Sequence, residues 1–383
     1  PDQSADPNLA YNRYLREQGY DGDNPWHTAA NASTGPDGEV LSGWYLRHAH
    51  LPANVAAEHS ETAYMTNRAI EKITDLGDTP WCLHLSYIKP HWPYMAPAPY
   101  HNMYSDSDIL PANRSDSEKQ TPNPVIEAFM QHEESRNFSR EEVRRRVIPA
   151  YMGLITEIDD NIGRLMASLK ASGRLEDTLI VFTSDHGDYL GDHWLGEKEM
   201  FHEESVRIPM IIYDPDQKAD ARRGADDDRL TEAVDLAATF VDALDGEAKP
   251  HILEGRSLLP LTRGDGHTVW RDTAFSEADY AFRGARHSLG LAPDETRAFM
   301  VRTSDWKYVS FDGFPPQLFD LRADPQELTD LGRSDSHQTI RAEMEARLAD
   351  WLKHRRMRTT IDHDTIARRT DNAKDRGYLF GVW

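Results

Sequence analysis

Two stretches of the sequence place acidic, imidazole and cationic side chains directly after apolar runs. Asp185 and His186 follow "TLIVFTS", and Lys89 and His91 follow "CLHLSYI". In open α/β sheets, reactive groups lie just past the carboxyl ends of the strands. A carboxylate beside an imidazole supplies two ligands for a divalent metal ion. Asp185 and His186 are therefore candidate metal ligands, with a turn-capping Asp and a buried, hydrogen-bonded His as the alternative.

A lysine follows the first pair at a distance that allows the chain to return. Lys198 comes 12 residues after His186, and a loop of that length can fold back over a strand end. Its ammonium could then reach an anion bound to the metal. Taken alone, Lys198 would be a surface residue, and Lys89 and His91 would be exposed loop side chains. Pro90 fixes the backbone between the latter two and keeps them close together.

Further imidazoles and carboxylates flank Lys198. His193 and His202 could each support a metal ligand through a hydrogen bond, although a structural role is the expectation we favour for both. Glu203 and Glu204 are expected to be solvated or to tie the loop in place.

The elements that must position these residues alternate between strands and helices. Strands are expected in "PWCLHLSYI", a short apolar run suited to a buried strand, and in "TLIVFTSD" and "VRIPMIIYDP". The β-branched runs of the last two are typical of parallel strands that are buried on both faces. Helices are expected at 60–76, with Ser60 as its cap, at 148–173 and at 230–246. Residues 1–58 and 101–145 are expected to be a loop and a long polar insertion. The alternation predicts an α/β fold with a mostly parallel sheet sandwiched by helices.

The pattern changes after about Gly255. "RAFMVRTSDWKYVSFDG" and "PPQLFDL" predict antiparallel strands, and "HQTIRAEMEARLADWLKHRR" predicts a closing helix. We expect a catalytic α/β domain at 1–255, a smaller C-terminal α+β subdomain at 256–355 and a tail at 356–383. The apolar end of the tail, "GYLFGVW", is expected to dock on its own domain or on a neighbour, which favours a homo-oligomer.

Composition limits the partners and the compartment. The 383 residues carry 43 Lys and Arg against 65 Asp and Glu, a net charge of −22, which argues against nucleic acid and anionic membranes but allows a small anionic substrate. No apolar run approaches the roughly 18 residues of a membrane span. The single cysteine, Cys82, excludes an intrachain disulfide and a Cys-rich zinc site, and favours a cytoplasmic location with a periplasmic one possible.

At this point the sequence resembles a known family. The segment "TLIVFTSDHGDYLGDHWLGEKEMFHEESVRIPMIIYDP" looks like the signature of the sulfatases and phosphonate monoester hydrolases, within the alkaline phosphatase superfamily. "KPHWPY", the helix "AYMGLITEIDDNIGRLMASL" and the hairpin "WKYVSFDGFPPQLFDLRADPQELTDL" match other parts of that family in order. The spacing from Asp185 to Lys198 and the stretch "YHNMY" are most similar to the phosphonate monoester hydrolase branch.

The resemblance implies a role for each candidate residue. Asp185 and His186 would be two ligands of one divalent metal ion, which could be Ca, Mg, Mn or Zn. Lys198 and His91 would hold the anionic oxygens of the substrate with Lys89 nearby, and His91 could also protonate the leaving group. Charge that develops on the oxygens of a tetrahedral anion is stabilised by a metal and by fixed cations.

The sequence departs from the family at the nucleophile. Family members carry an N-terminal strand that ends in further metal ligands, and then Cys (or Ser)-x-Pro-x-Arg, whose first residue becomes formylglycine. Cys82 is followed by "LHLS", and the motif occurs nowhere in the sequence. We therefore expect the sequence to begin inside the catalytic domain, with the formylglycine on a segment outside it. A truncated gene product and a pseudoenzyme are the alternatives.

These expectations give a leading function and two alternatives. The leading one is a metal-dependent hydrolase of sulfate esters or phosphonate/phosphate esters that uses a formylglycine nucleophile. The first alternative is a catalytically dead hydrolase-fold binding protein. The second is a phosphotransferase of the same superfamily, a class that lacks the Lys-Pro-His segment and the "DLRADPQEL" hairpin.

Overall fold

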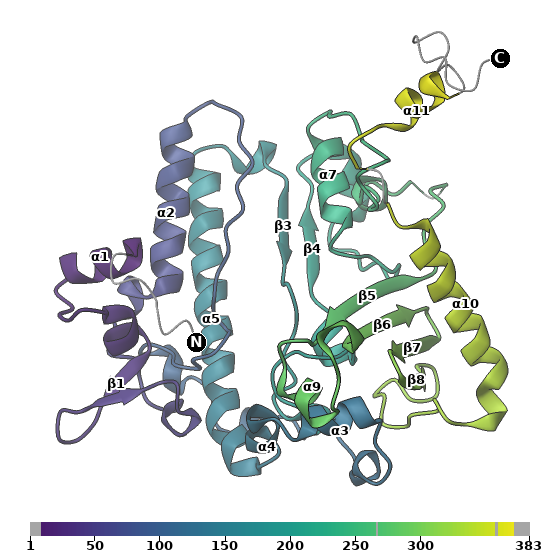
Figure 1. Cartoon of the computed structure of the whole chain (residues 1–383). Coiled ribbons are helices and arrows are strands. Elements are labelled where there is room, and N and C mark those ends of the chain that lie inside the picture. Colours follow the sequence, from purple (N-terminus) through teal and green to yellow (C-terminus); the bar gives the residue numbers. More distant parts are fainter. Residues whose placement is uncertain (1–8, 266, 357–358, 371–383) are drawn as a thin grey trace, which may run out of the picture. The chain divides into compact units, whose positions relative to one another are not determined.

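The computed structural model describes residues 9–265, 267–356 and 359–370, which form two compact units with interleaved segments (Figure 1). The first unit comprises the chain up to Arg114, Glu133–Asp177 and Tyr189–Glu197. The second comprises Ser115–His132, Thr178–Asp188 and the chain from Lys198 onward. The domains predicted from the sequence, 1–255 and 256–355, are single continuous ranges, whereas each compact unit consists of several segments. Shifts in composition along a sequence do not reveal a segment that leaves a unit and returns to it.

Two long helices lie side by side in the first unit (Figure 1). They are α2, Glu61–Leu76, and α5, Glu141–Ala171. Ser60 caps α2 as predicted, because its Oγ accepts a hydrogen bond from the Ala63 amide at 3.1 Å. The predicted helix at 148–173 is confirmed, but α5 begins earlier, at Glu141, and contains Pro149. A proline removes one hydrogen bond without always ending a helix.

The expectation of a loop at 1–58 is wrong for part of that segment. It contains the α-helix α1 (Ala10–Glu17) and two short strands that pair antiparallel, β1 (Ala32–Thr34) and β2 (Val40–Ser42). Tyr11 and Leu15, four residues apart on α1, bury their side chains in a cluster with Val55 and Met95. A pair of apolar residues on so short a helix gives too little periodicity to stand out in a polar sequence.

The polar insertion at 101–145 also contains helices. They are α3 (Pro124–Met130) in the second unit and α4 (Glu133–Phe138) in the first, ahead of the start of α5.

Strand pairing in the second unit differs from the prediction. β3 (Ile180–Thr183) and β4 (Met210–Tyr213) form as expected, but they pair antiparallel, with Thr183 opposite Met210. In the first unit, the expected strand in "PWCLHLSYI" does not form, since residues 80–88 take part in no ladder. Both expectations rested on apolar composition. Apolar composition indicates a segment that can be buried, but it does not specify the direction or the partner of a strand.

The predicted antiparallel strands and closing helix of the second unit are confirmed. The sheet has the order β5–β6–β7–β8, with β5 at Ala274–Asp279, β6 at Arg297–Arg302, β7 at Trp306–Phe311 and β8 at Phe314–Asp320. Helix α10, Gln338–His354, packs on it (Figure 1). Val301, Tyr308 and Leu318 from the strands meet Met344 and Leu348 from the helix in one buried cluster.

The remaining helices of the second unit are short. They are α6 (Glu203–Val206), α7 (Asp235–Ala243), α8 (Leu259–Thr262), α9 (Gly284–Ser288) and α11 (His363–Arg369). Helix α7 confirms the helix expected at 230–246, although it is shorter. The tail segment "GYLFGVW" lies outside the described residues. None of the described helices combines the length and the apolar character that a membrane span requires.

Candidate active site

Asp185 and His186 follow the end of β3, and each has an electron-pair donor atom that lies close to that of the other. His186 Nδ1 lies 2.7 Å from the Gly187 carbonyl oxygen. A carbonyl oxygen can only accept, so Nδ1 carries the proton and Nε2 of the neutral ring carries the lone pair. Nε2 is 3.5 Å from Asp185 Oδ2, and the Asp185 carboxylate is well exposed. This donor set suits a divalent cation, because the backbone contact fixes the tautomer that a metal ligand needs.

Ser205 ties Lys198 to the same stretch of chain. The Gly187 amide donates to the Ser205 carbonyl at 2.8 Å. The Ser205 hydroxyl in turn donates to the Lys198 carbonyl at 2.5 Å. The chain from His186 to Lys198 therefore folds back on itself, with one serine bridging its two ends, while the role of the Lys198 ammonium stays a prediction.

Gly187 has no room for a side chain, and this gives a testable expectation. A Cβ at this position would overlap the carbonyl oxygen of Glu204. Gly187→Ala should therefore force the backbone apart and lower the free energy of unfolding by at least about 1–3 kcal/mol. The matched control is Gly163→Ala on α5, where a Cβ would meet nothing within 4 Å. Chemical denaturation checks the difference, and equal midpoints for the two variants would contradict the overlap.

His91 and Lys89 belong to the first unit. His91 Nδ1 lies 2.7 Å from the Trp92 carbonyl oxygen, so the proton again resides on Nδ1 and Nε2 of the neutral ring bears the lone pair. The imidazole also packs against the Trp92 ring, with 4.5 Å between the centroids. The ring is therefore held in a defined orientation by its own neighbour in the sequence.

Lys89 is buried, with its ammonium committed to two acceptors. Nζ donates to Asn31 Oδ1 at 2.9 Å and to the Pro93 carbonyl at 2.6 Å. Burial lowers the pKa of Lys89 to about 8, although the carboxylates of Glu61 and Glu157 oppose the shift. These contacts fix the loop that carries His91, and binding of substrate oxygens by Lys89 stays a prediction.

The carboxyl group of Glu157 beside Lys89 gives an expected pH dependence. Burial raises the pKa of Glu157 to about 7, against the lowering effects of a hydrogen bond from Ser60 and of Lys89. In the folded protein Glu157 keeps its proton at pH values where the unfolded chain has lost it. The free energy of unfolding should therefore fall as the pH rises from about 4.5 to about 7.

Glu157→Gln should remove this contribution. Denaturation of both proteins at about pH 5 and about pH 7 measures it, and the stability of the unaltered protein relative to the variant should fall with rising pH. Parallel pH profiles would show that the pKa of Glu157 is not raised in the folded state.

His193 and His202 are both buried and have structural contacts. His193 Nε2 is 3.3 Å from Asn113 Nδ2, and the imidazole meets the ring of Tyr189 edge-on. His202 packs edge-on against Phe319, and its carbonyl accepts from the amide of Ser205 at 2.9 Å. These surroundings fit the structural role that we favoured, and support of a metal ligand by either ring stays a prediction.

The described residues do not complete a metal site by themselves. Within residues 9–265, 267–356 and 359–370, no group of three or more His, Cys, Asp and Glu side chains is arranged to hold a metal ion. Asp185 and His186 supply two possible ligand atoms for a metal ion, and these two are the ligands that the sequence predicts. Cys82 is exposed.

Sequence reasoning did not identify the residues that link these candidates. Ser205 acts through its hydroxyl and its carbonyl, Asn31 through its side-chain amide and Pro93 through its carbonyl, and these groups carry no recognisable motif. Gly187 could have been found, because a glycine directly after an Asp-His pair suggests a close backbone approach.

Family models match nearly the whole described chain. The sulfatase model matches residues 3–246, and the model for the C-terminal part of N-sulphoglucosamine sulphohydrolase matches residues 191–354. The two matches overlap in the segment that holds Lys198, Ser205 and β4.

Individual relatives come from the same group of enzymes. The chain is 33% identical over 320 residues to the multifunctional alkaline phosphatase superfamily protein PehA of Trinickia caryophylli, covering 79% of this chain and 62% of that protein. It is 31% identical over 336 residues to the choline-sulfatase of Rhizobium meliloti, covering 82% of this chain and 61% of that protein. The chain thus spans about three fifths of the length of these curated relatives.

A solved structure shows the same fold. The phosphonate monoester hydrolase SpPMH from Silicibacter pomeroyi superposes with a TM-score of 0.82 at 26% identity, covering 93% of this chain and 72% of that one. The predicted fold class, an alkaline phosphatase/sulfatase-like α/β fold with a smaller C-terminal α+β part, is therefore confirmed. By its family match, its relatives and its fold, the chain belongs to the sulfatase family within the alkaline phosphatase superfamily.

Proposed function

We propose that this chain is part of a metal-dependent hydrolase of sulfate esters or phosphonate/phosphate esters. The observation that carries the proposal is the Asp185–His186 pair at the end of β3. Ser205 connects the chain beside this pair to Lys198 through hydrogen bonds. Relatives named as a choline-sulfatase and a phosphonate monoester hydrolase support this substrate range. A small anionic ester is also compatible with a chain of net charge −22, because a few cationic side chains at the site are enough to bind a small anion.

Each candidate residue has a defined task in this proposal. Asp185 and His186 would hold one divalent cation (Ca, Mg, Mn or Zn), and when bound it stabilises negative charge on the tetrahedral group of the substrate. Lys198 would bind an oxygen of that group through its ammonium. His91 would gain a proton at Nε2 and donate it to the leaving-group oxygen. The formylglycine nucleophile would come from polypeptide outside these 383 residues.

The proposal is tested on the protein purified from its source gene. Peptide mapping should find a Cys-x-Pro-x-Arg peptide about 18 Da lighter than its cysteine form, the mass change expected for formylglycine. Assays with an aryl sulfate, a phenyl phosphonate monoester and a phosphodiester should show hydrolysis of at least one, and a chelator should abolish it. A metal-loaded protein that hydrolyses none of the three would overturn the proposal in favour of a binding protein with a hydrolase fold.

A further inference from the structure

The loop Tyr189–Glu197 separates the Asp185–His186 pair from Lys198, and its backbone is strained. Four of its non-glycine residues have positive φ angles, namely Leu190 (46°), His193 (49°), Trp194 (62°) and Glu197 (58°). Residues with a Cβ rarely adopt this region, and they do so only where the surroundings hold them there. Contacts with other segments of the first unit must therefore stabilise this loop conformation.

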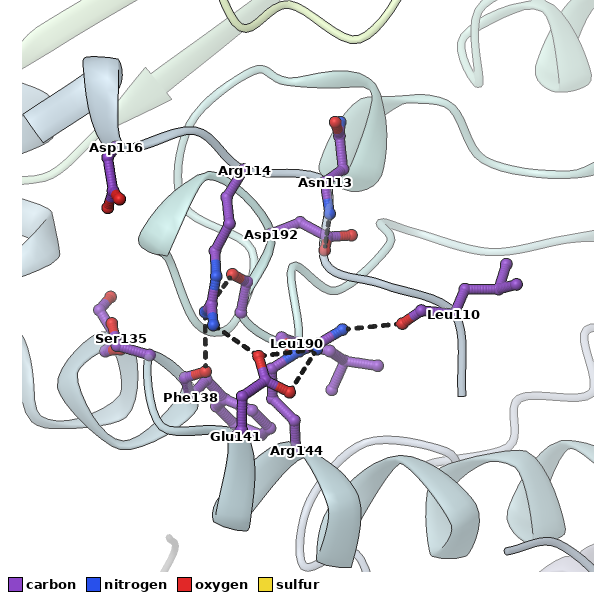
Figure 2. Close-up of polar contacts among 12 residues, drawn as sticks. Leu110, Asn113, Arg114, Asp116, Ser135, Phe138, Glu141, Arg144, Leu190 and Asp192 are labelled. Atoms are coloured by element: carbon purple, nitrogen blue, oxygen red, sulfur yellow. Dashed lines mark hydrogen bonds and ion pairs between the residues drawn. The ribbon is translucent and has the colours of Figure 1, made fainter. Parts of the chain in front are cut away.

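Arg144 on α5 is one of the groups that hold it. Its side chain is almost completely buried, and its Nε donates to the Leu190 carbonyl at 3.1 Å (Figure 2). Nη2 donates to the Leu110 carbonyl at 3.3 Å, and Nη1 contacts both carboxylate oxygens of Glu141. One guanidinium on α5 thus contacts the strained loop, the backbone at Leu110 and Glu141.

Arg114 holds the next residue of the loop. Its Nη1 donates to the Gly191 carbonyl at 3.1 Å, and its Nη2 donates to Glu141 Oε1 at 2.7 Å (Figure 2). The guanidinium also lies over the Trp194 ring, 4.2 Å from its centroid. Glu141 therefore balances two guanidinium groups, and each of them donates to a carbonyl of the loop.

Other hydrogen bonds also hold the loop against the first unit. The Asn113 amide donates to Asp192 Oδ1 at 2.8 Å, and the Gly196 amide donates to Ser135 Oγ at 3.1 Å. Gly191 has no room for a Cβ, which would lie 2.6 Å from the Phe138 carbonyl oxygen and 2.8 Å from Arg144 Cδ. The loop is therefore in close contact with the groups that bind it.

The two ends of the loop meet, so the conformation of the loop determines where the chain leaves it relative to where it enters. The Tyr189 amide donates to the Glu197 carbonyl at 2.8 Å, which brings the neighbouring residues Asp188 and Lys198 close together. We infer that Arg144 and Arg114 are positioning residues, which hold the strained loop in the conformation whose two ends meet, so that Lys198 returns beside Asp188, two residues after His186. This inference rests on the proposed function.

Substitutions at Arg144 can separate its charge from its hydrogen bonds. Arg144→Lys keeps a cation beside Glu141, but a compact ammonium cannot reproduce the planar fork that reaches both the Leu190 and the Leu110 carbonyls. Arg144→Met removes the charge as well. The matched control is Arg145→Met, which changes the exposed neighbour on the same helix. Gly191→Ala is a fourth variant, which keeps both arginines and pushes the loop away from them.

Two measurements on the complete gene product test the inference. Amide hydrogen exchange should become at least about tenfold faster in Arg144→Lys within residues 189–198, the factor expected when one net hydrogen bond is lost. Steady-state kinetics should show kcat/KM lowered at least about tenfold, mainly through a higher KM for the anionic substrate, because Lys198 is displaced. Gly191→Ala should reproduce both effects, and Arg145→Met should show neither.

Each possible result decides the question. Unchanged exchange in 189–198 for Arg144→Lys and Gly191→Ala would overturn the inference. Faster exchange with unchanged kcat and KM would also overturn it, because the arginines would then stabilise the loop without positioning Lys198. If the unaltered protein hydrolyses none of the three ester classes, the proposed function has failed instead. The exchange comparison then still decides whether the arginines hold the loop.

Discussion

Asp185→Asn in the complete gene product is expected to lower kcat/KM for the ester substrate by at least about 100-fold. Loss of a group that only supports a metal ligand typically costs 10–100-fold, and loss of a ligand should cost more. Asn is close in shape to Asp but brings no negative charge, so the lone pair of His186 Nε2 would have no carboxylate beside it. Because the Asp185 side chain is well exposed, the fold should be unaffected, with a stability change within about 0.5 kcal/mol.

Metal content separates this effect from a general loss of activity. Elemental analysis of the purified variant should show less bound divalent metal per chain than in the unaltered protein. Asp294→Asn, at another exposed aspartate, is the control and should leave metal content and turnover unchanged. If Asp185→Asn keeps both its metal and its activity, Asp185 is not a metal ligand.

The elements that the sequence predicted well are those with local signals. Helix α2 has a serine cap at Ser60 and a glycine after its end, and both act within a few residues. The strand that precedes the Asp185–His186 pair could be found because its apolar run predicts it, while the metal-binding role of the pair stays a prediction. The β5–β8 sheet and α10 were likewise visible from alternating and helical periodicity.

The features that sequence reasoning did not predict depend on contacts between distant residues. The apolar residues of β3 and β4 indicate strands, yet nothing in either strand fixes the antiparallel direction. Arg144 reaches Leu190, which lies 46 positions away, and it binds a carbonyl group that every residue has. Lys89 was interpreted as a loop cation, and its burial became visible only once Asn31, 58 positions away, lay against it.

Two buried cations of this acidic chain, one in each unit, are paired with carboxylates. Arg144 is paired with Glu141 in the first unit. In the second unit Lys307 is completely buried and lies 2.8 Å from Glu203 Oε1 and 2.7 Å from Glu327 Oε1. Burial of a cation without such a partner is costly, and Lys89, whose two acceptors are neutral, accordingly has a lowered pKa. The excess of carboxylates thus supplies counter-charges inside the fold as well as charge on its surface.

The Lys307 cluster connects the C-terminal sheet to the segment that follows Lys198. Lys307 on β7 also donates to the Phe201 carbonyl at 2.8 Å. Glu327 accepts from the Glu203 amide at 2.7 Å, and Arg302 on β6 lies 3.2 Å from Glu203 Oε1. The cluster therefore holds the chain at 201–203 on the sheet through charges that are largely shielded from water.

Lys307→Met is expected to lower the free energy of unfolding by about 3–5 kcal/mol, because it leaves the buried carboxylate of Glu327 without its cation. Chemical denaturation measures the loss, with Lys353→Met, an exposed lysine on α10, as the control that should change stability by less than about 0.5 kcal/mol. The double variant Lys307→Met with Glu327→Gln should be at least as stable as Lys307→Met alone, since the second change removes the unpaired charge. A loss for Lys307→Met as small as that of the control would mean that water reaches Glu327 and that the cluster is not a buried one.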